Sequence, residues 1–160
     1  MKRPYAILTA LSLILLFSCK KKDTPAGTNY GKINIKISYR VDTKPLAFDT
    51  MIYVNQAGHS YAIERLQYYL NNFRFYKAGK LCYTANDVVF LDAKKDTTAT
   101  VSINMTQGIE SGKYDSLTFY IGLDTPYNIS NSLPATLENI GMGWPDVMGG
   151  GYHFIKLEGH

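Results

Sequence analysis

Residues 32–41 read KINIKISYRV, with an apolar or aromatic side chain at every odd position and a polar one at every even position. Successive side chains of a β-strand point to opposite faces, so this period of two predicts a strand with one buried and one solvated face. No segment of the chain sustains a period of 3.6 residues. The stretch therefore indicates an all-β protein whose sheets each bury one face.

Several other short segments concentrate apolar residues between turn signals. The chain also holds 13 Tyr and seven Phe residues, which are favoured in strands. Many short strands separated by turns are typical of a β-sandwich. We therefore predict an antiparallel β-sandwich with minor helical turns, and further strands at 51–54, 80–83, 88–91, 100–105, 116–123 and 152–158.

Residues 61–77 carry two competing signals. Glu64–Gln67 could begin a helix, whereas Tyr68, Leu70, Phe73 and Phe75 follow a strand pattern whose parity changes at residues 71–72. A β-bulge adds one residue to a strand and shifts its alternation in this way. We expect a short helical turn followed by one long strand with a bulge.

The N-terminus has the pattern of an export signal. Lys2 and Arg3 precede a short apolar run that ends in Leu16-Phe17-Ser18-Cys19. The run is too short to span a bilayer, and its end resembles the lipobox of bacterial lipoproteins. We expect residues 1–19 to be a lipoprotein signal peptide with Cys19 lipidated, residues 20–29 to be a flexible tether, and residues 30–160 to form the domain.

The lipid on Cys19 predicts a protein of the cell envelope that is held on a membrane. Lys20 follows the cysteine, where many lipoproteins kept at the inner membrane have Asp. We therefore expect an outer-membrane lipoprotein facing the periplasm or the surface. The alternative is an ordinary secretory signal in which Cys19 is incidental.

The charge of the domain and the motifs that the sequence lacks argue against several classes of function. Five of the 17 basic residues precede Asp23, and from there the chain has 12 basic and 13 acidic residues. A near-neutral domain does not favour nucleic-acid binding, which requires a basic face. The sequence has none of the usual hydrolase, nucleotide-binding or zinc-protease motifs, so we expect no enzymatic activity. Cys82 is expected to be a buried, inert strand residue.

The end of the chain is its most distinctive part. Residues 141–159 contain the only Trp, Trp144, and three consecutive glycines that lead into a strand carrying His153. Three glycines let the backbone turn where a side chain would clash, and this turn should bring Trp144 and His153 together. After the strand, Gly159 suggests a turn with nothing to follow, so we expect an incomplete domain whose last strand has unpaired backbone groups on one side.

This stretch resembles the MbnP family, the copper-binding MbnP-like domain. The family pattern is a Met- and Trp-containing loop, a Gly-Tyr turn and an aromatic strand ending in Leu-Glu-Gly. Similar segments occur at 53–58, 68–72 and 119–124, so the resemblance runs from about Gly31 to His160. Family members are longer, so the chain would correspond to the N-terminal portion of the domain.

The resemblance implies an exported copper-binding accessory protein with a di-haem MbnH-like oxidase as its partner. It implies that Trp144 is oxidised to kynurenine beside the metal, and that His153, His160 and Met142 are candidate copper ligands. Imidazole and thioether groups both suit copper. Related sites have a His two residues after the modified Trp, where this chain has Asp146.

A purely structural role is the alternative for each of these residues. Trp144 could be a packed core aromatic and His153 a strand residue that packs locally. His59 is expected in a surface turn, and Asp92–Asp96 in a solvated turn rather than a calcium site. For the whole protein, the alternatives are a surface adhesion or glycan-binding lipoprotein, in which exposed Tyr residues stack on sugars, and a purely structural β-domain.

Overall fold

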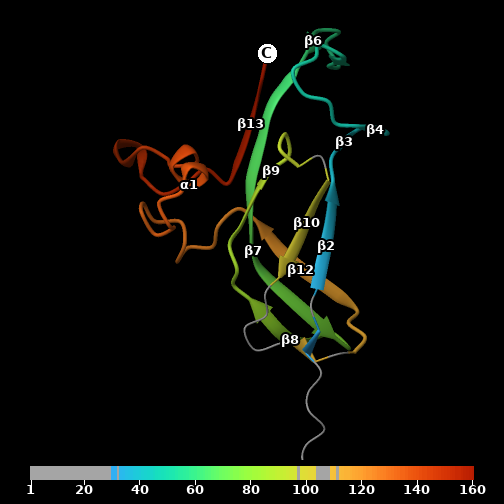
Figure 1. Cartoon of the computed structure of the whole chain (residues 1–160), viewed down its shortest axis with the longest axis vertical. Coiled ribbons are helices and arrows are strands. Elements are labelled where there is room, and N and C mark those ends of the chain that lie inside the picture. The colour runs from blue at the N-terminus through green and yellow to red at the C-terminus, as the bar shows by residue number, and fades with distance from the viewer. Residues whose placement is uncertain (1–29, 32, 97, 104–108, 111) are drawn as a thin grey trace, which may run out of the picture.

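A computed structural model describes residues 30–160 except 32, 97, 104–108 and 111. The predicted signal peptide with Cys19 and the predicted tether lie outside the described residues. The described chain is mainly antiparallel β-structure, as predicted (Figure 1). Its elements are β1 Tyr30–Gly31, β2 Ile33–Ser38, β3 Arg40–Val41, β4 Lys44–Pro45, β5 Tyr53–Val54, β6 Ser60–Tyr61, β7 Ile63–Lys77, β8 Lys80–Ala85, β9 Val89–Asp92, β10 Thr98–Ile103, β11 Ile109–Glu110, β12 Ser116–Ile121, α1 Leu137–Gly141, the 3-10 helix η1 Asp146–Met148 and β13 Ile155–Gly159.

Strand β7 organises the main sheet, because β8, β9, β12 and β13 all pair with it. The pairing register shows which strands lie on each side of β7. Leu70 lies between a β12 partner and a β9 partner, and Tyr68 lies between a β13 partner and a β9 partner. Strands β12 and β13 therefore lie end to end on one flank of β7, opposite β9.

The junction between β12 and β13 is at Tyr69. Its carbonyl accepts a hydrogen bond from the Gly122 amide at 2.8 Å, and its own amide donates to the Phe154 carbonyl at 3.2 Å. Gly122 has a φ of +123°, and a Cβ there would lie 2.8 Å from Cγ of Phe154. Only glycine lets the two strand ends meet this closely.

The predicted bulge is present in β7. Asn71 pairs with Tyr120 and Arg74 with Thr118, so two β7 residues face one β12 residue. Asn72 takes a φ of +56°, in the left-handed region. The extra residue explains why the buried side chains change from even to odd positions along the strand.

The stretch that predicted the fold as one strand is divided at Tyr39. Ile33–Ser38 is β2, which pairs with β10 in a second sheet, and Arg40–Val41 is β3, which pairs with β4. Ile33, Ile35 and Ile37 pack against buried residues of the main sheet, while the residues between them are exposed. Two antiparallel sheets thus enclose one apolar core, as expected for a sandwich. That core comprises Tyr68, Leu70, Phe73, Phe75, Ala85, Leu91, Ala99 and Val101.

The structure corrects two local expectations. Glu64–Gln67 is not a helical turn but part of β7, because Arg65 and Gln67 pair with Glu158 and Lys156 of β13. Cys82 lies in β8 as expected, but it is exposed rather than buried. The helical turns lie instead in a lobe after β12, where α1 begins with Thr136 as its N-cap.

This lobe has its own small core on the opposite face of β7. Tyr69, Leu123, Met142 and Tyr152 form it, and the Tyr69 hydroxyl donates to Oδ1 of Asn139 at 2.8 Å. The lobe is thereby attached to the sheet. It holds both the Trp-containing loop and the triple glycine.

Candidate metal centre

The residues singled out near the C-terminus come together through a short antiparallel arrangement. Gly143 forms a β-bridge with Tyr152. On either side of it, the Trp144 amide donates to the Gly151 carbonyl at 2.9 Å, and the His153 amide donates to the Met142 carbonyl at 2.8 Å. The chain between these pairs must reverse direction, and it does so through η1 and the glycines.

The three glycines are required by this reversal. Gly149, Gly150 and Gly151 have φ values of +113°, +69° and +83°, all in the left-handed region. A Cβ on Gly151 would also lie 2.7 Å from Oδ1 of Asn128, which accepts a hydrogen bond from the Tyr152 amide. The turn therefore requires glycine, and the side chain of Asn128 holds it in place through the hydrogen bond with Tyr152.

Trp144 and His153 are in direct contact. Their ring centroids are 4.6 Å apart and their planes make an angle of 86°, an edge-to-face arrangement. The prediction that the glycine turn would bring these two residues together is confirmed. The indole Nε1 donates to the Met148 carbonyl at 3.1 Å, which fixes the ring, yet 36% of Trp144 is exposed.

The imidazole of His153 is available for a ligand. It is partly buried, and in the described part of the chain neither of its ring nitrogens takes part in a hydrogen bond or ion pair. Its backbone is fixed by the bond to Met142. A positioned imidazole with a free ring nitrogen is a suitable donor for a copper ion.

Met142 and Met148 differ in accessibility. The Met142 side chain is fully buried in the small core, in contact with residues such as Tyr69 and Tyr152. Met148, in η1, is 63% exposed, and its carbonyl accepts the hydrogen bond from the Trp144 indole. Met142 thus contributes its carbonyl to the position of His153, whereas Met148 presents its thioether to solvent.

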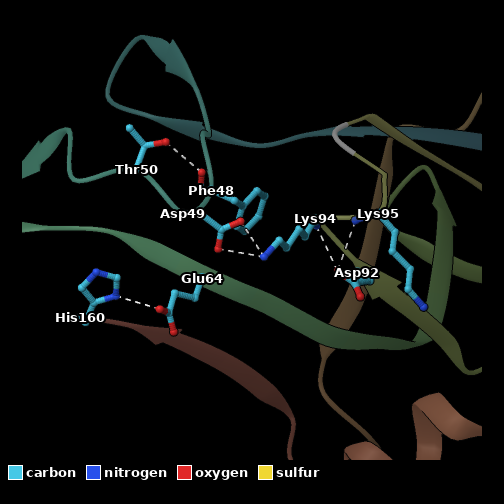
Figure 2. Close-up of polar contacts among 8 residues, drawn as sticks. All are labelled: Phe48, Asp49, Thr50, Glu64, Asp92, Lys94, Lys95 and His160. Atoms are coloured by element: carbon cyan, nitrogen blue, oxygen red, sulfur yellow. Dashed lines mark hydrogen bonds and ion pairs between the residues drawn. The ribbon is translucent and has the colours of Figure 1, made fainter.

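His160 lies at the other end of β13, away from His153. Its Nδ1 is 2.8 Å from Oε1 of Glu64, and Figure 2 shows this contact at the far end of the strand. Seven residues of extended chain separate the two histidines, roughly 20 Å. The structure therefore does not bring His160 and His153 to one site.

The remaining candidates behave as turn residues. His59 is exposed, and its amide donates to Oδ1 of Asn55 at 3.0 Å. Oδ1 of Asp92 accepts the amides of Lys94 and Lys95, which closes a turn (Figure 2). The turn of His59 is solvated, as expected, whereas Asp92 is buried and its Oδ2 also accepts a hydrogen bond from Nε2 of Gln67 at 2.8 Å.

The possible metal ligands around Trp144 and His153 fit a copper ion in part. His153 supplies one imidazole, with Trp144 against it and the Met148 thioether in the same loop. Among the described residues, no group of three or more His, Cys, Asp or Glu side chains converges on one point. This region therefore offers one strong ligand, the His153 imidazole, and not a complete set of ligands.

The comparisons with known proteins identify the domain. The MbnP family model matches residues 30–160, which is most of the chain. Comparison with curated proteins and with solved structures gives no match. None of the described helices is long and apolar enough to cross a membrane. The chain thus belongs to the MbnP family, whose members are associated with copper.

Proposed function

We propose that this protein is an exported, lipid-anchored copper-binding accessory protein, in which His153 is a metal ligand beside an oxidised Trp144. The observation that carries the proposal is the contact between the two rings at 4.6 Å. It joins an imidazole whose ring nitrogens have no partner among the described residues to the one indole of the chain. Family membership supplies the association with copper.

The environment of Trp144 suits its conversion to kynurenine. Oxidation breaks the C2–C3 bond of the indole and leaves one oxygen atom on each of the two carbons. Hydrolysis then releases C2 as formate. Peroxide is a suitable oxidant, since each molecule gives one oxygen atom and leaves as water. Because 36% of Trp144 is exposed, an oxidising partner can approach the ring from solvent. The resulting ketone and aromatic amine would lie against the His153 imidazole.

Oxidation and copper binding are roles of two different proteins. A di-haem MbnH-like oxidase would carry out the oxidation, so this chain is its substrate and not itself an enzyme. The lipid on Cys19 would hold the domain at the outer membrane. His153 would then bind copper through a ring nitrogen, with Met148 rather than the buried Met142 as the accessible thioether.

The described surface gives little support to glycan binding. Among the tyrosines whose side chains are described, Tyr120 alone is exposed, and the guanidinium of Arg74 lies 5.7 Å from its ring centre. Stacking on sugars requires an open strip of aromatic faces. The other described tyrosines are at least partly buried.

Copper titration of the full chain tests the proposal. His153→Ala should weaken copper binding at least about 10-fold, because loss of one ligand should exceed about 1.4 kcal/mol. His59→Ala is the matched control, since it removes an exposed imidazole from a distant turn and should leave the affinity unchanged. Equal affinities of the two variants would remove His153 from the site, and absence of copper binding by the unsubstituted chain would contradict the function.

A further inference from the structure

Ser130 joins the two segments that carry Trp144 and His153. It lies between β12 and α1, and its hydroxyl makes two hydrogen bonds. The hydroxyl donates to Oδ1 of Asp146, and it accepts a hydrogen bond from the Gly151 amide at 2.8 Å. Asp146 is two residues after Trp144, and Gly151 is two residues before His153. One side chain from outside the reversal therefore ties its two sides together.

The direction of these bonds depends on Asp146. A hydroxyl has one proton and two lone pairs, so Ser130 can accept from the Gly151 amide only while its own proton points elsewhere. The carboxylate of Asp146 gives that proton an acceptor, and a charged acceptor makes a stronger hydrogen bond than a neutral one. Asp146 thus orients the hydroxyl that holds Gly151.

The second glycine leaves room for this arrangement within the glycine turn, residues 149–151. A Cβ on Gly150 would lie 2.6 Å from Oγ of Ser130 and 2.9 Å from Oδ1 of Asp146. Contacts this short would displace the hydroxyl or the carboxylate, so glycine is required here by space as well as by its φ of +69°. The glycine turn and the two polar side chains therefore fit each other.

Gly151 transmits the effect of Ser130 to the two rings. Its carbonyl accepts from the Trp144 amide at 2.9 Å and its amide donates to Ser130, so both of its backbone polar groups are bound. Glycine has more backbone freedom than any other residue, so release of the amide would let Gly151 rotate. Its carbonyl would then move relative to Trp144, and the chain that leads on to His153 would move as well. The edge-to-face contact of the rings at 4.6 Å depends on both segments.

We propose that Ser130 and Asp146 are positioning residues of the candidate metal centre. Asp146 orients the hydroxyl of Ser130, and this hydroxyl holds the glycine turn in one conformation. That conformation keeps Trp144 against His153. The effect of the two residues on copper binding rests on the proposed function, whereas their effect on the ring contact does not.

Nuclear magnetic resonance of the full chain tests the ring contact without copper. Trp144 is the only Trp, so its indole N–H gives a single signal that is readily assigned. Ser130→Ala and Asp146→Ala should weaken the nuclear Overhauser effect between the indole and imidazole rings. Both should also speed hydrogen exchange of the Gly151 amide by roughly 5-fold or more, because its acceptor is lost or misoriented. Asp146→Asn should preserve contact and protection, since its side-chain oxygen can still accept the Ser130 proton.

Ser132→Ala is the matched control. Ser132 is in the same loop as Ser130, but its hydroxyl donates to the Tyr127 carbonyl and not to the glycine turn. The control should leave the ring contact and the Gly151 amide unchanged. A ring contact that persists in both Ser130→Ala and Asp146→Ala would overturn the proposal. So would an equal loss in the Ser132 control, or a loss in Asp146→Asn as large as that in Asp146→Ala.

Copper titration separates this inference from the proposed function. Ser130→Ala should weaken copper binding several-fold, but it should add little in the His153→Ala background, because Ser130 acts through the position of His153. Independent sites give additive losses, so additive losses in the double variant would contradict that route. If the unsubstituted chain binds no copper, the proposed function fails, and the ring contact in the Ser130 and Asp146 variants still decides the positioning role.

Discussion

The side-chain amide of Asn72 donates to Oδ2 of Asp124 at 2.9 Å, which ties the bulge of β7 to the turn that follows β12. Both residues sit at a change of direction. Asn72 has a φ of +56° and also accepts a hydrogen bond from Nε of Arg74 at 2.9 Å. Because the lobe with the candidate site starts at this turn, the bulge fixes where the lobe leaves the sheet.

Replacement of Asn72 should reveal both of its roles. Asn72→Ala loses two hydrogen bonds and strains the backbone, so the free energy of unfolding should fall by about 2–4 kcal/mol. Asn72→Gly loses the same bonds but accepts the positive φ, and should cost about 1 kcal/mol less. Urea unfolding followed by fluorescence measures both, and equal losses would show that the backbone conformation carries no strain.

The triple glycine permits a test with a control from the same turn. Gly151→Ala places a Cβ against Asn128, whereas Gly149 also has a positive φ, +113°, but a Cβ there would have no atom within 4 Å. Both variants should lose some stability, but only Gly151→Ala should also displace the segment that carries His153. We expect it to weaken copper binding several-fold more than Gly149→Ala does. Identical copper titrations of the two variants would show that the site tolerates movement of this segment.

Alkaline pH should destabilise the protein through its buried tyrosines. Burial, reinforced by the nearby Tyr152 and Glu138, raises the pKa of Tyr69 to about 12. Between pH 10 and pH 12 the unfolded chain loses this proton while the folded chain keeps it. The free energy of unfolding should therefore fall by up to about 1.4 kcal/mol per pH unit for this residue.

Tyr69→Phe separates this effect from other alkaline titrations. The variant loses its bond to Asn139 at every pH, but its stability should decline less steeply above pH 10 than that of the parent. Tyr68 should contribute in the same direction, because burial and its hydrogen bond with Tyr39 raise its pKa. Parallel curves for parent and Tyr69→Phe would show that Tyr69 does not titrate in this range.

Protein from the native host should carry a modified Trp144. Mass spectrometry of the peptide should show that this residue has lost one carbon and gained one oxygen. His153→Ala serves as the control, because oxidation by a partner requires access to the indole and not a metal ligand, so the modification should persist. An unmodified Trp144 would leave copper binding by His153 intact and remove the oxidation step.

The proposed lipid anchor depends on Cys19. Cys19→Ala should prevent labelling with a palmitate analogue and release the protein from the membrane fraction or stall it as a precursor. Cys82→Ser, which removes the exposed thiol of β8, is the control and should leave both unchanged. Membrane association and labelling that persist in the Cys19→Ala variant would contradict the anchor, and migration with inner-membrane markers would contradict the outer-membrane location.

Local sequence determined the features that depend on side-chain alternation and backbone sterics. The period of two in residues 33–37 assigned a buried face to β2, and the parity change at Asn71–Asn72 located the bulge. Three glycines required a sharp turn, which brought Trp144 to His153. Each inference needs only neighbouring residues, because strand geometry and φ restrictions act over a few positions.

Tertiary structure alone decided which distant groups meet. Glu64–Gln67 has a helix-compatible composition, yet it is a strand because β13, about 90 residues later, supplies its hydrogen-bonding partner. The same pairing carries His160 to Glu64 and away from His153, and packing on Tyr69 buries the Met142 thioether. Pairing and burial depend on contacts between residues far apart in the chain, so no local pattern distinguishes the exposed Met148 from the buried Met142.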